Sequence, residues 1–431
     1  MLDGLIHLRK GTVSSAPGFC LRFGVLPGLD EVLVSIFHAP ASYTGEDMAE
    51  VSCHASGFIV AEFLRRLSDA GARIAEPGEF TRRAFLNGKI DLAQAEAVAD
   101  LISSSSSAQH RLAFNQLRGG FSSELAKIRE QLLELTTLME LELDFSEEEV
   151  EFADRSKLQE LLDSAFSHCT RLADSFKVGN ALRNGIPVAI IGAPNSGKST
   201  LLNALLNDDR AIVSEIPGTT RDTVEETCVL GGILFRFIDT AGIRQASDKI
   251  ERLGIERTLQ KASRAEVVLG VFDVTGESFE SAAQEIARLV DFESQKLIIL
   301  ANKVDISEAN KNVNSSNNFV LPGDLQRVGV SVIPISAKEG LGLDHLKDSL
   351  ISSVGQLSSA DTLVTNERHA AALRATAASL ATVRSGLSSG LPTDLLAEDL
   401  RSALSTLGTI TGHITSDEIL GEIFGRFCIG K

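Results

Sequence analysis

Several features are missing from this sequence of 431 residues. No apolar run reaches the roughly 18 residues that a membrane-spanning helix needs. The first residues, Met1 to Gly4, carry neither the basic nor the apolar segment of a secretory signal. The five cysteines are odd in number and widely scattered, which argues for a reducing compartment rather than a disulfide framework. These absences favour a cytoplasmic protein without a membrane partner.

Positive charge is also scarce. The chain has 41 Lys and Arg against 58 Asp and Glu, a formal net charge of −17. Proteins that bind nucleic acid along their whole surface are normally basic, so composition alone argues against RNA. Any RNA contact therefore needs a local basic patch. A hydrophobic fraction of 43% is enough for packed cores, and the length suggests two or three domains.

The most informative stretch is Gly192–Ser199, which reads Gly-Ala-Pro-Asn-Ser-Gly-Lys-Ser. It follows the apolar run 188–191 and precedes an apolar helical pattern, the context of a phosphate-binding loop. Glycines let backbone N–H groups turn toward phosphate oxygens, and the helix start adds partial positive charge. Lys198 can reach the β- and γ-phosphates, and Ser199 can ligate Mg²⁺. The alternative is a glycine turn without a ligand.

Three further short sequences, each after a strand-like run, narrow the ligand to GTP. Asp239–Gly242 can hold the Mg²⁺ shell and sense the γ-phosphate. In Asn302–Asp305, the Asp305 carboxylate can accept two hydrogen bonds from guanine, a donor pair that adenine lacks. Ser336–Lys338 can close over the base. Together they predict a P-loop GTPase domain, α/β and doubly wound around a mostly parallel sheet.

The residue after Gly242 departs from Ras-like GTPases, which carry a water-orienting Gln there. Ile243 can neither donate nor accept a hydrogen bond, so hydrolysis needs another group. Arg244 is either an arginine finger or a solvated charge, and the residues alone favour the solvated charge.

Three stretches, Pro217–Asp222, Asp239–Glu256 and the terminal Cys428–Lys431, resemble the MnmE (TrmE) family of tRNA-modification GTPases. The resemblance covers nearly the whole chain. It implies K⁺-stimulated GTP hydrolysis by a homodimer that works with MnmG (GidA), a partner carrying FAD. Together they would add an aminomethyl or carboxymethylaminomethyl group to C5 of the tRNA wobble uridine. A tetrahydrofolate derivative would donate the one-carbon unit.

The resemblance also implies an architecture: a GTPase domain inserted into a helical domain, preceded by a small α/β domain for dimerisation and folate. The expected bounds are 1–90 for the α/β domain, 91–183 and 353–431 for the helical domain with its Cys-Ile-Gly-Lys tail, and 184–352 for the GTPase. In the family the first domain opens with a further strand and helix, including an Arg that contacts folate, and this chain begins after them.

Local patterns predict several elements. Residues 31–37 are typical of a strand and 57–67 of a helix, whereas 42–47 and 76–80 are turn signals whose polar residues are expected to be solvated. Apolar residues recur at helical spacing from Leu125 to Met139. The serine run 103–107 is predicted to be an exposed or polar-packed helical stretch, because its flanks are helical in pattern; a linker is the alternative. Segments 369–378 and 394–404 are amphipathic and expected to pack on 92–180, and 411–424 is expected to be a loop and a helix capped by Ser416 or Asp417.

The resemblance to the family implies further site residues, in addition to those inferred from side-chain chemistry. Glu251 would position the attacking water once two GTPase domains meet; a helix-start charge is the alternative. Cys428 would be needed for modification in a role that the residues do not define. Mg²⁺ would be held by Ser199 and Thr220, and folate by Glu50, Lys89 and Lys431. K⁺ would be held by Asn195 with loop oxygens of Ser214, Ile216 and Thr219, although Asn195 is as well explained as a loop cap.

The predicted GTP-binding set is Asn195, Ser196, Gly197, Lys198, Ser199, Thr200, Ser214, Glu215, Ile216, Pro217, Gly218, Thr219, Thr220, Asp239, Thr240, Ala241, Gly242, Asn302, Lys303, Val304, Asp305, Ser336, Ala337 and Lys338.

Two other functions fit part of the sequence. A potassium-dependent ribosome-assembly GTPase shares the stretch 218–222, but such proteins usually add a basic RNA-binding module or a second GTPase domain, and neither is seen. A regulatory GTPase switch without modification activity needs only the GTPase domain.

Overall fold

The computed structural model describes residues 1–144, 155–209, 226–238, 263, 265–276, 278–306, 321–327, 329–355, 362–414, 417–425, 427 and 430. The chain divides into two compact units. The first comprises Met1–Ala99, Gln116–Leu162 and Ala378–Lys431, and the second comprises Asp100–Asn115 and Asp163–Ala377.

The first unit begins with a short 3-10 helix, η1 (Leu2–Gly4), and a four-stranded antiparallel sheet whose strands lie in chain order. The strands are β1 (His7–Leu8), β2 (Cys20–Leu26), β3 (Asp30–Phe37) and β4 (Met48–Ser52). Alternate residues of β3, namely Val32, Val34 and Ile36, are buried together with Phe63 of helix α1 (Gly57–Asp69). This alternation is what a half-buried strand requires, and both predicted elements are confirmed.

The loop after β3 is tied to helix α2 (Glu79–Leu86) rather than solvated. The hydroxyl groups of Tyr43 and Thr81 lie 2.9 Å apart, and Asn87 Nδ2 donates to the Thr44 carbonyl at 2.8 Å. The Thr44 and Thr81 residues are only 2% and 0% exposed. The expectation that the polar residues of 42–47 are solvated is therefore wrong for Thr44, because a helix 35 residues or more downstream covers it.

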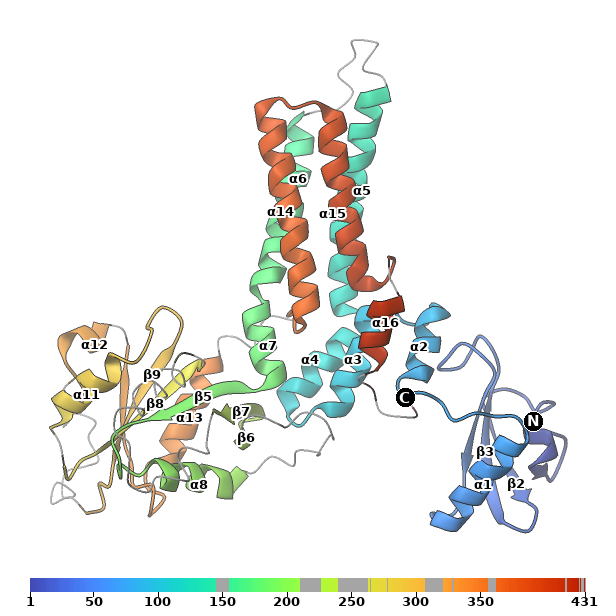
Figure 1. Cartoon of the computed structure of the whole chain (residues 1–431), viewed down its shortest axis with the longest axis horizontal. Helices are drawn as coiled ribbons and strands as arrows, with labels where there is room; N and C mark the ends of the chain where they lie inside the picture. The colour runs from blue at the N-terminus through green and yellow to red at the C-terminus, as the bar shows by residue number, and fades with distance from the viewer. Residues whose placement is uncertain are drawn as a thin grey trace. The chain divides into compact units, whose positions relative to one another are not determined.

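The helices that follow are α3 (Leu92–Ser103), α4 (Ser107–Leu117), α5 (Gly120–Asp144), α6 (Arg155–Asp174), α7 (Phe176–Asn184), α14 (Glu367–Ser389), α15 (Thr393–Thr411) and α16 (Asp417–Phe424). The predicted apolar stripe of α5 is buried from Leu125 to Met139. Helix α15 packs along α5 (Figure 1), where Leu400, Ala403 and Leu407 are buried. The expectation that 394–404 packs on the earlier helical segment is confirmed. Ser416, one of the two predicted caps of α16, lies outside the described residues.

The serine run is not a continuous helix. Helix α3 ends at Ser103 and α4 begins at Ser107, so the prediction is wrong for 104–106. Gln109 Oε1 accepts hydrogen bonds from the backbone N–H groups of Ser105 and Ser106 at 2.8 and 3.0 Å. Ser104 Oγ donates to the Leu101 carbonyl at 2.8 Å. Side chains thus satisfy the backbone groups that a continuing helix would have paired.

The second unit contains a six-stranded sheet in the order β10-β9-β8-β5-β7-β6, parallel except for β6. Its strands are β5 (Ile186–Ile191), β6 (Glu226–Leu230), β7 (Ile233–Phe237), β8 (Val267–Asp273), β9 (Lys296–Asn302) and β10 (Ser331–Pro334). The central strands are apolar throughout, because both faces are covered. Helices α8 (Lys198–Asp209) and α13 (Leu343–Gly355) cover one face, and α11 (Phe279–Ala287) and α12 (Gly323–Arg327) the other. The doubly wound, mostly parallel fold is confirmed.

Helix α7 leads directly into β5, and an ion pair fixes this junction. Arg183 Nη2 lies 2.6 Å from Asp100 Oδ1, and the backbone carbonyl of Arg183 accepts a hydrogen bond from Gln109 Nε2 at 2.7 Å. Arg183 Nη1 donates to the Thr365 carbonyl at 3.4 Å. The entry of the sheet is thereby held by three segments that are distant in the sequence.

Candidate nucleotide-binding site

The predicted short sequences converge on one edge of the six-stranded sheet. The loop 192–197 follows β5, Asn302 ends β9, and Ser336 follows β10. Because these strands are parallel, their carboxyl ends meet at the same edge, the usual position for a ligand in this class of fold.

The loop 192–197 requires glycine at two places. Gly192 has φ +146°, and a Cβ there would lie 2.0 Å from the Val271 carbonyl oxygen. Gly197 has φ +100°, and a Cβ there would lie 2.0 Å from Asn302 Nδ2. A side chain at either position would therefore collide with a neighbouring strand or its end, so the loop can pack closely against β8 and β9 only with glycine.

Lys198 lies over this loop. Its Nζ donates to the carbonyl oxygens of Gly192 and Ala193 at 2.9 and 2.6 Å. The ammonium group is thus held above the curled backbone, within reach of an anion that enters the loop. Ser196 Oγ is buried and makes no hydrogen bond to any described residue. An orphaned buried hydroxyl beside an ammonium group fits a phosphate ligand.

Asn302 joins the three parts of the site. Its side chain is buried, with the residue 2% exposed. Nδ2 donates to the Ser196 carbonyl at 2.7 Å, and Oδ1 accepts from the Ala337 N–H at 3.0 Å. One amide therefore connects the phosphate loop with the segment predicted to cover the base.

Asp273, at the end of β8, is a residue that the sequence analysis missed. Its Oδ2 lies 2.5 Å from Lys303 Nζ, and Oδ1 accepts from Thr275 N and Oγ1 at 2.9 and 2.7 Å. Burial raises the pKa of Asp273, but the hydrogen bonds from Lys303 and Thr275 outweigh this effect and leave the pKa below its usual value. The carboxylate is ionised at neutral pH and can pair with Lys303.

The backbone of Lys303 is unusual. Its φ is +68°, in the left-handed region that few residues other than glycine adopt. The ion pair to Asp273 and the hydrogen bonds of the adjacent Asn302 hold it there. The only sequence signal for Asp273 was its position, since it is an acidic residue at the end of a fully apolar run. Asn302 ends the apolar run of the next strand in the same way.

The segment after β10 is closed on itself. Ser336 is 0% exposed; its N–H donates to the Leu341 carbonyl at 3.0 Å, and its Oγ accepts from Glu339 N at 3.2 Å. The side chain of Lys338 is exposed, and that of Asp305 is half-buried at the same edge. The structure thus brings together the described members of the predicted set from 195–200, 302–305 and 336–338.

The remaining predicted residues of the GTP site lie outside the described residues. They are Ser214, Glu215, Ile216, Pro217, Gly218, Thr219, Thr220, Asp239, Thr240, Ala241 and Gly242. Ile243, Arg244, the proposed catalytic Glu251, and the tail residues Cys428 and Lys431 do so as well. Their roles stay predictions.

Two predicted folate contacts lie in the first unit. Glu50 is exposed on the edge strand β4, opposite Ser35 of β3. Lys89 Nζ donates to the Pro40 carbonyl at 3.0 Å, and its side chain packs beside Gly45. Among the residues that the structure describes, no group of three or more His, Cys, Asp or Glu is arranged to hold a metal ion, and no helix is long and apolar enough to cross a membrane.

The fold and the edge of its sheet define a P-loop GTPase with a glycine-rich phosphate loop, an Asn-Lys-x-Asp segment whose Asn is buried, and a Ser-Ala-Lys segment. Sequence comparison then identifies the family. The profile of the MnmE helical domain matches residues 92–428, and that of the TrmE amino terminus matches 24–89. The chain belongs to the MnmE family of tRNA modification GTPases, and it is an enzyme of the GTPase class.

Relatives share about half of their residues with this chain. The tRNA modification GTPase MnmE of Flavobacterium johnsoniae is 50% identical over 94% of this chain and 86% of its own length. Those of Parabacteroides distasonis and Christiangramia forsetii are 50% and 48% identical over 97% and 98% of this chain, and 91% of each relative. Among solved structures, the G domain of the T. maritima FeoB iron transporter is 24% identical and covers 40% of this chain and 99% of its own, but its TM-score of 0.27 carries no weight.

Proposed function

We propose that this chain hydrolyses GTP and couples the hydrolysis to modification of tRNA. The observation that carries the proposal is the position of Asn302, whose buried amide connects the phosphate loop to the base-covering segment. That arrangement supports binding of a nucleotide whose phosphates and base are held at the same time. The names of the relatives, tRNA modification GTPases, support tRNA as the substrate.

In the proposed complex, the N–H groups of 195–200 and Lys198 hold the phosphates, and Asp305 accepts from the guanine N1–H and amine. Ser199 and Thr220 would ligate Mg²⁺, which neutralises phosphate charge when bound, with Asp239 in its outer shell. The orphaned Ser196 hydroxyl and the inward Lys198 are consistent with this ligand.

For the potassium ion, we propose Asn195 with loop oxygens of Ser214, Ile216 and Thr219 as ligands. The Asn195 side chain is exposed, and it makes no hydrogen bond to any described residue. This favours a ligand role over the loop cap, in which its side-chain oxygen would accept a hydrogen bond from a backbone N–H. Its backbone has φ +61°, a conformation that Asn tolerates better than most residues. Glu251 is the proposed water-positioning residue.

The modification step is proposed from the family. A homodimer in the cytoplasm would work with the FAD-carrying MnmG at C5 of the wobble uridine, using a tetrahydrofolate derivative bound near Glu50, Lys89 and Lys431. Cys428 would take part in a role that is not assigned. The proposed domain bounds remain 1–90, 91–183 with 353–431, and 184–352. No observation favours a ribosome-assembly role or a switch without modification over this function.

Reconstitution tests the proposal. The chain is mixed with its FAD partner, unmodified tRNA, GTP, NADH and methylene-tetrahydrofolate in K⁺ or Na⁺ buffer, and the nucleosides are identified by mass spectrometry. We expect a modified wobble uridine, and faster GTP hydrolysis in K⁺ than in Na⁺. Unmodified uridine alongside rapid hydrolysis would contradict the coupling, and equal rates in both buffers would contradict the potassium site.

A further inference from the structure

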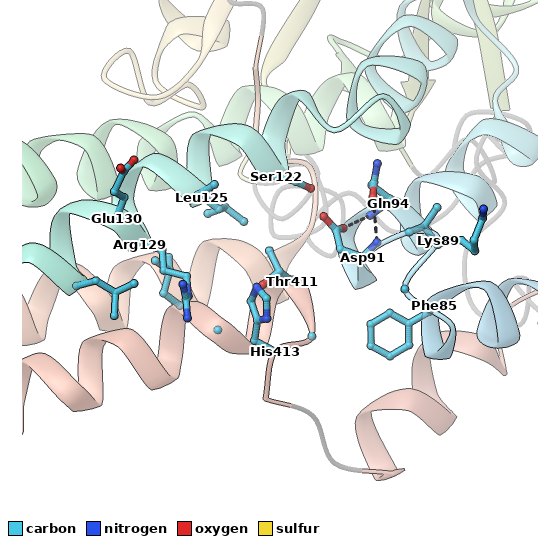
Figure 2. Close-up of a pocket in the computed structure, with 17 residues that line it drawn as sticks. Phe85, Lys89, Asp91, Gln94, Ser122, Leu125, Arg129, Glu130, Thr411 and His413 are labelled. Atoms are coloured by element: carbon cyan, nitrogen blue, oxygen red, sulfur yellow. Dashed lines mark hydrogen bonds between the residues drawn. The ribbon is translucent and has the colours of Figure 1, made fainter. Parts of the chain in front are cut away.

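The first unit contains a pocket of about 630 Å³ that the GTPase site does not use (Figure 2). Three segments surround it: the end of α2 with the following loop and the start of α3, one face of α5, and the end of α15 with the two residues after it. The α5 face consists of Ser122, Leu125, Ala126, Arg129, Glu130 and Leu133. Because these residues recur at helical spacing, they form a continuous wall.

The cationic side chains at this pocket differ from most others in the unit. Arg65, Arg73, Arg83, Lys127 and Arg401 are each neutralised by a carboxylate at 2.5 to 3.2 Å. Arg129 forms no ion pair or hydrogen bond with any described residue, and it is exposed. Lys89 also lines the pocket, but it is kept for the proposed folate contact. In a chain with a net charge of −17, a cation without a carboxylate partner, such as Arg129, marks a surface that can still attract an anion.

A second observation comes from Ser122, in the first turn of α5. Its Oγ is buried from solvent and has no hydrogen-bond partner among the described residues. Serine in a helix normally pairs its hydroxyl with a carbonyl one turn earlier, so an orphaned buried hydroxyl calls for an explanation. Ser122 lies two turns from Arg129 on the same face, and both line the pocket. A ligand that lies along α5 can contact both residues.

The rest of the lining suits a nucleotide. Leu125, Leu133 and Leu407 provide an apolar floor for a sugar and base. Asp91 and Glu130 are acceptors for the N–H groups of a base edge, while Arg129 is a donor for phosphate. His413 is exposed at the rim. A small carboxylate would use Arg129 but leave both acidic groups facing an anion, whereas a nucleotide uses both kinds of group.

We propose that this pocket binds a nucleotide of single-stranded RNA from the anticodon loop of the tRNA, with Arg129 on a phosphate and the Ser122 hydroxyl on the same nucleotide or its neighbour. The inference rests on the proposed function, in which tRNA is the substrate. Exposed Arg129 and His413 at the rim leave the site open to a polymer that continues beyond it. Arg129 supplies the positive charge for one phosphate, and the carboxylates of Asp91 and Glu130 stay available for the base.

The test is fluorescence anisotropy of the full chain with a fluorescein-labelled anticodon stem-loop RNA at several salt concentrations. Arg129→Ala is expected to weaken binding about tenfold and to reduce the slope of log affinity against log salt by about 0.7, the value for one phosphate of a single strand. Lys127→Ala is the matched control, because it removes one cation from the same helix outside the pocket lining, where Lys127 is paired with Glu124. It is expected to bind within about twofold of the parent.

Ser122→Ala separates RNA binding from stability. Removing an unpaired buried hydroxyl leaves no partner unsatisfied, so the melting temperature should stay the same or rise. RNA binding should weaken by about threefold or more, the loss of one hydrogen bond. A merely structural serine would leave RNA affinity unchanged.

Wild-type affinity in both Arg129→Ala and Ser122→Ala would overturn the pocket assignment, as would an equal loss in Lys127→Ala. If the parent chain binds no RNA but the reconstituted complex still modifies tRNA, the pocket assignment fails and the proposed function stands. If the parent binds no RNA and no uridine is modified, the proposed function fails as well.

Discussion

At the residue scale, the GTPase site depends on a few side chains that each make contacts in two directions. Asn302 bonds to the phosphate loop and to Ala337, and Asp273 bonds to Lys303 and to Thr275. Such residues hold neighbouring loops in place, Asn302 from a buried position and Asp273 from a partly buried one. Substitutions there should change nucleotide affinity more than the fold.

Asp305→Asn is expected to change the base specificity of the site from guanine to xanthine. The carboxylate can accept from two guanine donors, whereas an amide offers one donor to the xanthine 2-oxo group. We expect GTP affinity to fall roughly 100-fold or more and XTP affinity to rise. Equilibrium binding of fluorescent GDP and XDP measures both. Unchanged GDP affinity would remove Asp305 from the base site.

Asp273→Asn tests a positioning residue. Lys303 would lose its ion pair while its backbone stays in the left-handed region, so the base-binding segment would be less well ordered. We expect KM for GTP to rise about tenfold with little change in kcat. A tenfold rise corresponds to the loss of one partly buried charge-assisted hydrogen bond.

Asp291→Asn is the control, since the Asp291 carboxylate accepts hydrogen bonds only from Ser294 and Glu293 in its own turn within the described residues. A fall in kcat with unchanged KM for Asp273→Asn would contradict the positioning role.

At the element scale, side-chain periodicity predicted those helices and strands that depend on contacts between residues close in the sequence. The stripe from Leu125 to Met139 and the apolar strands of the second unit follow directly from side-chain periodicity. The turn at 104–106 does not, because it depends on Gln109 reaching back to two N–H groups. The burial of Thr44 and the role of Asp273 depend on contacts with residues 30 or more positions away, which one sequence does not reveal.

Gln109→Ala should destabilise the second unit through this turn. Its amide satisfies two backbone N–H groups and donates to the Arg183 carbonyl at the entry of β5. Leaving these groups unpaired costs about 1–3 kcal/mol each, so unfolding should occur at lower denaturant. Gln326→Ala, an exposed glutamine in the same unit, is the control and should change little. Equal midpoints for the two variants would contradict the structural role.

At the scale of the whole molecule, two compact units have separate cores and separate candidate sites. The GTPase site lies wholly in the second unit, and the RNA pocket lies wholly in the first. Ligands for the two can therefore be tested independently in the intact chain.

GDP with Mg²⁺ should protect amides of the second unit from hydrogen exchange without protecting the β2–β3 pair. At a ligand concentration of 100 Kd, binding stabilises the folded site by about 2.7 kcal/mol, which should slow exchange in 186–201, 298–305 and 333–341. Mass spectrometry of peptides from the intact chain measures this. Protection of equal size in 20–37 would mean that the two units do not respond separately.

The amide of Asn302 has a consequence for the rate at which nucleotide leaves. Because the phosphate loop and the base-covering segment each hold one hydrogen bond to this side chain, one amide restrains both segments around the nucleotide. Such a shared restraint should slow the release of a fluorescent GDP.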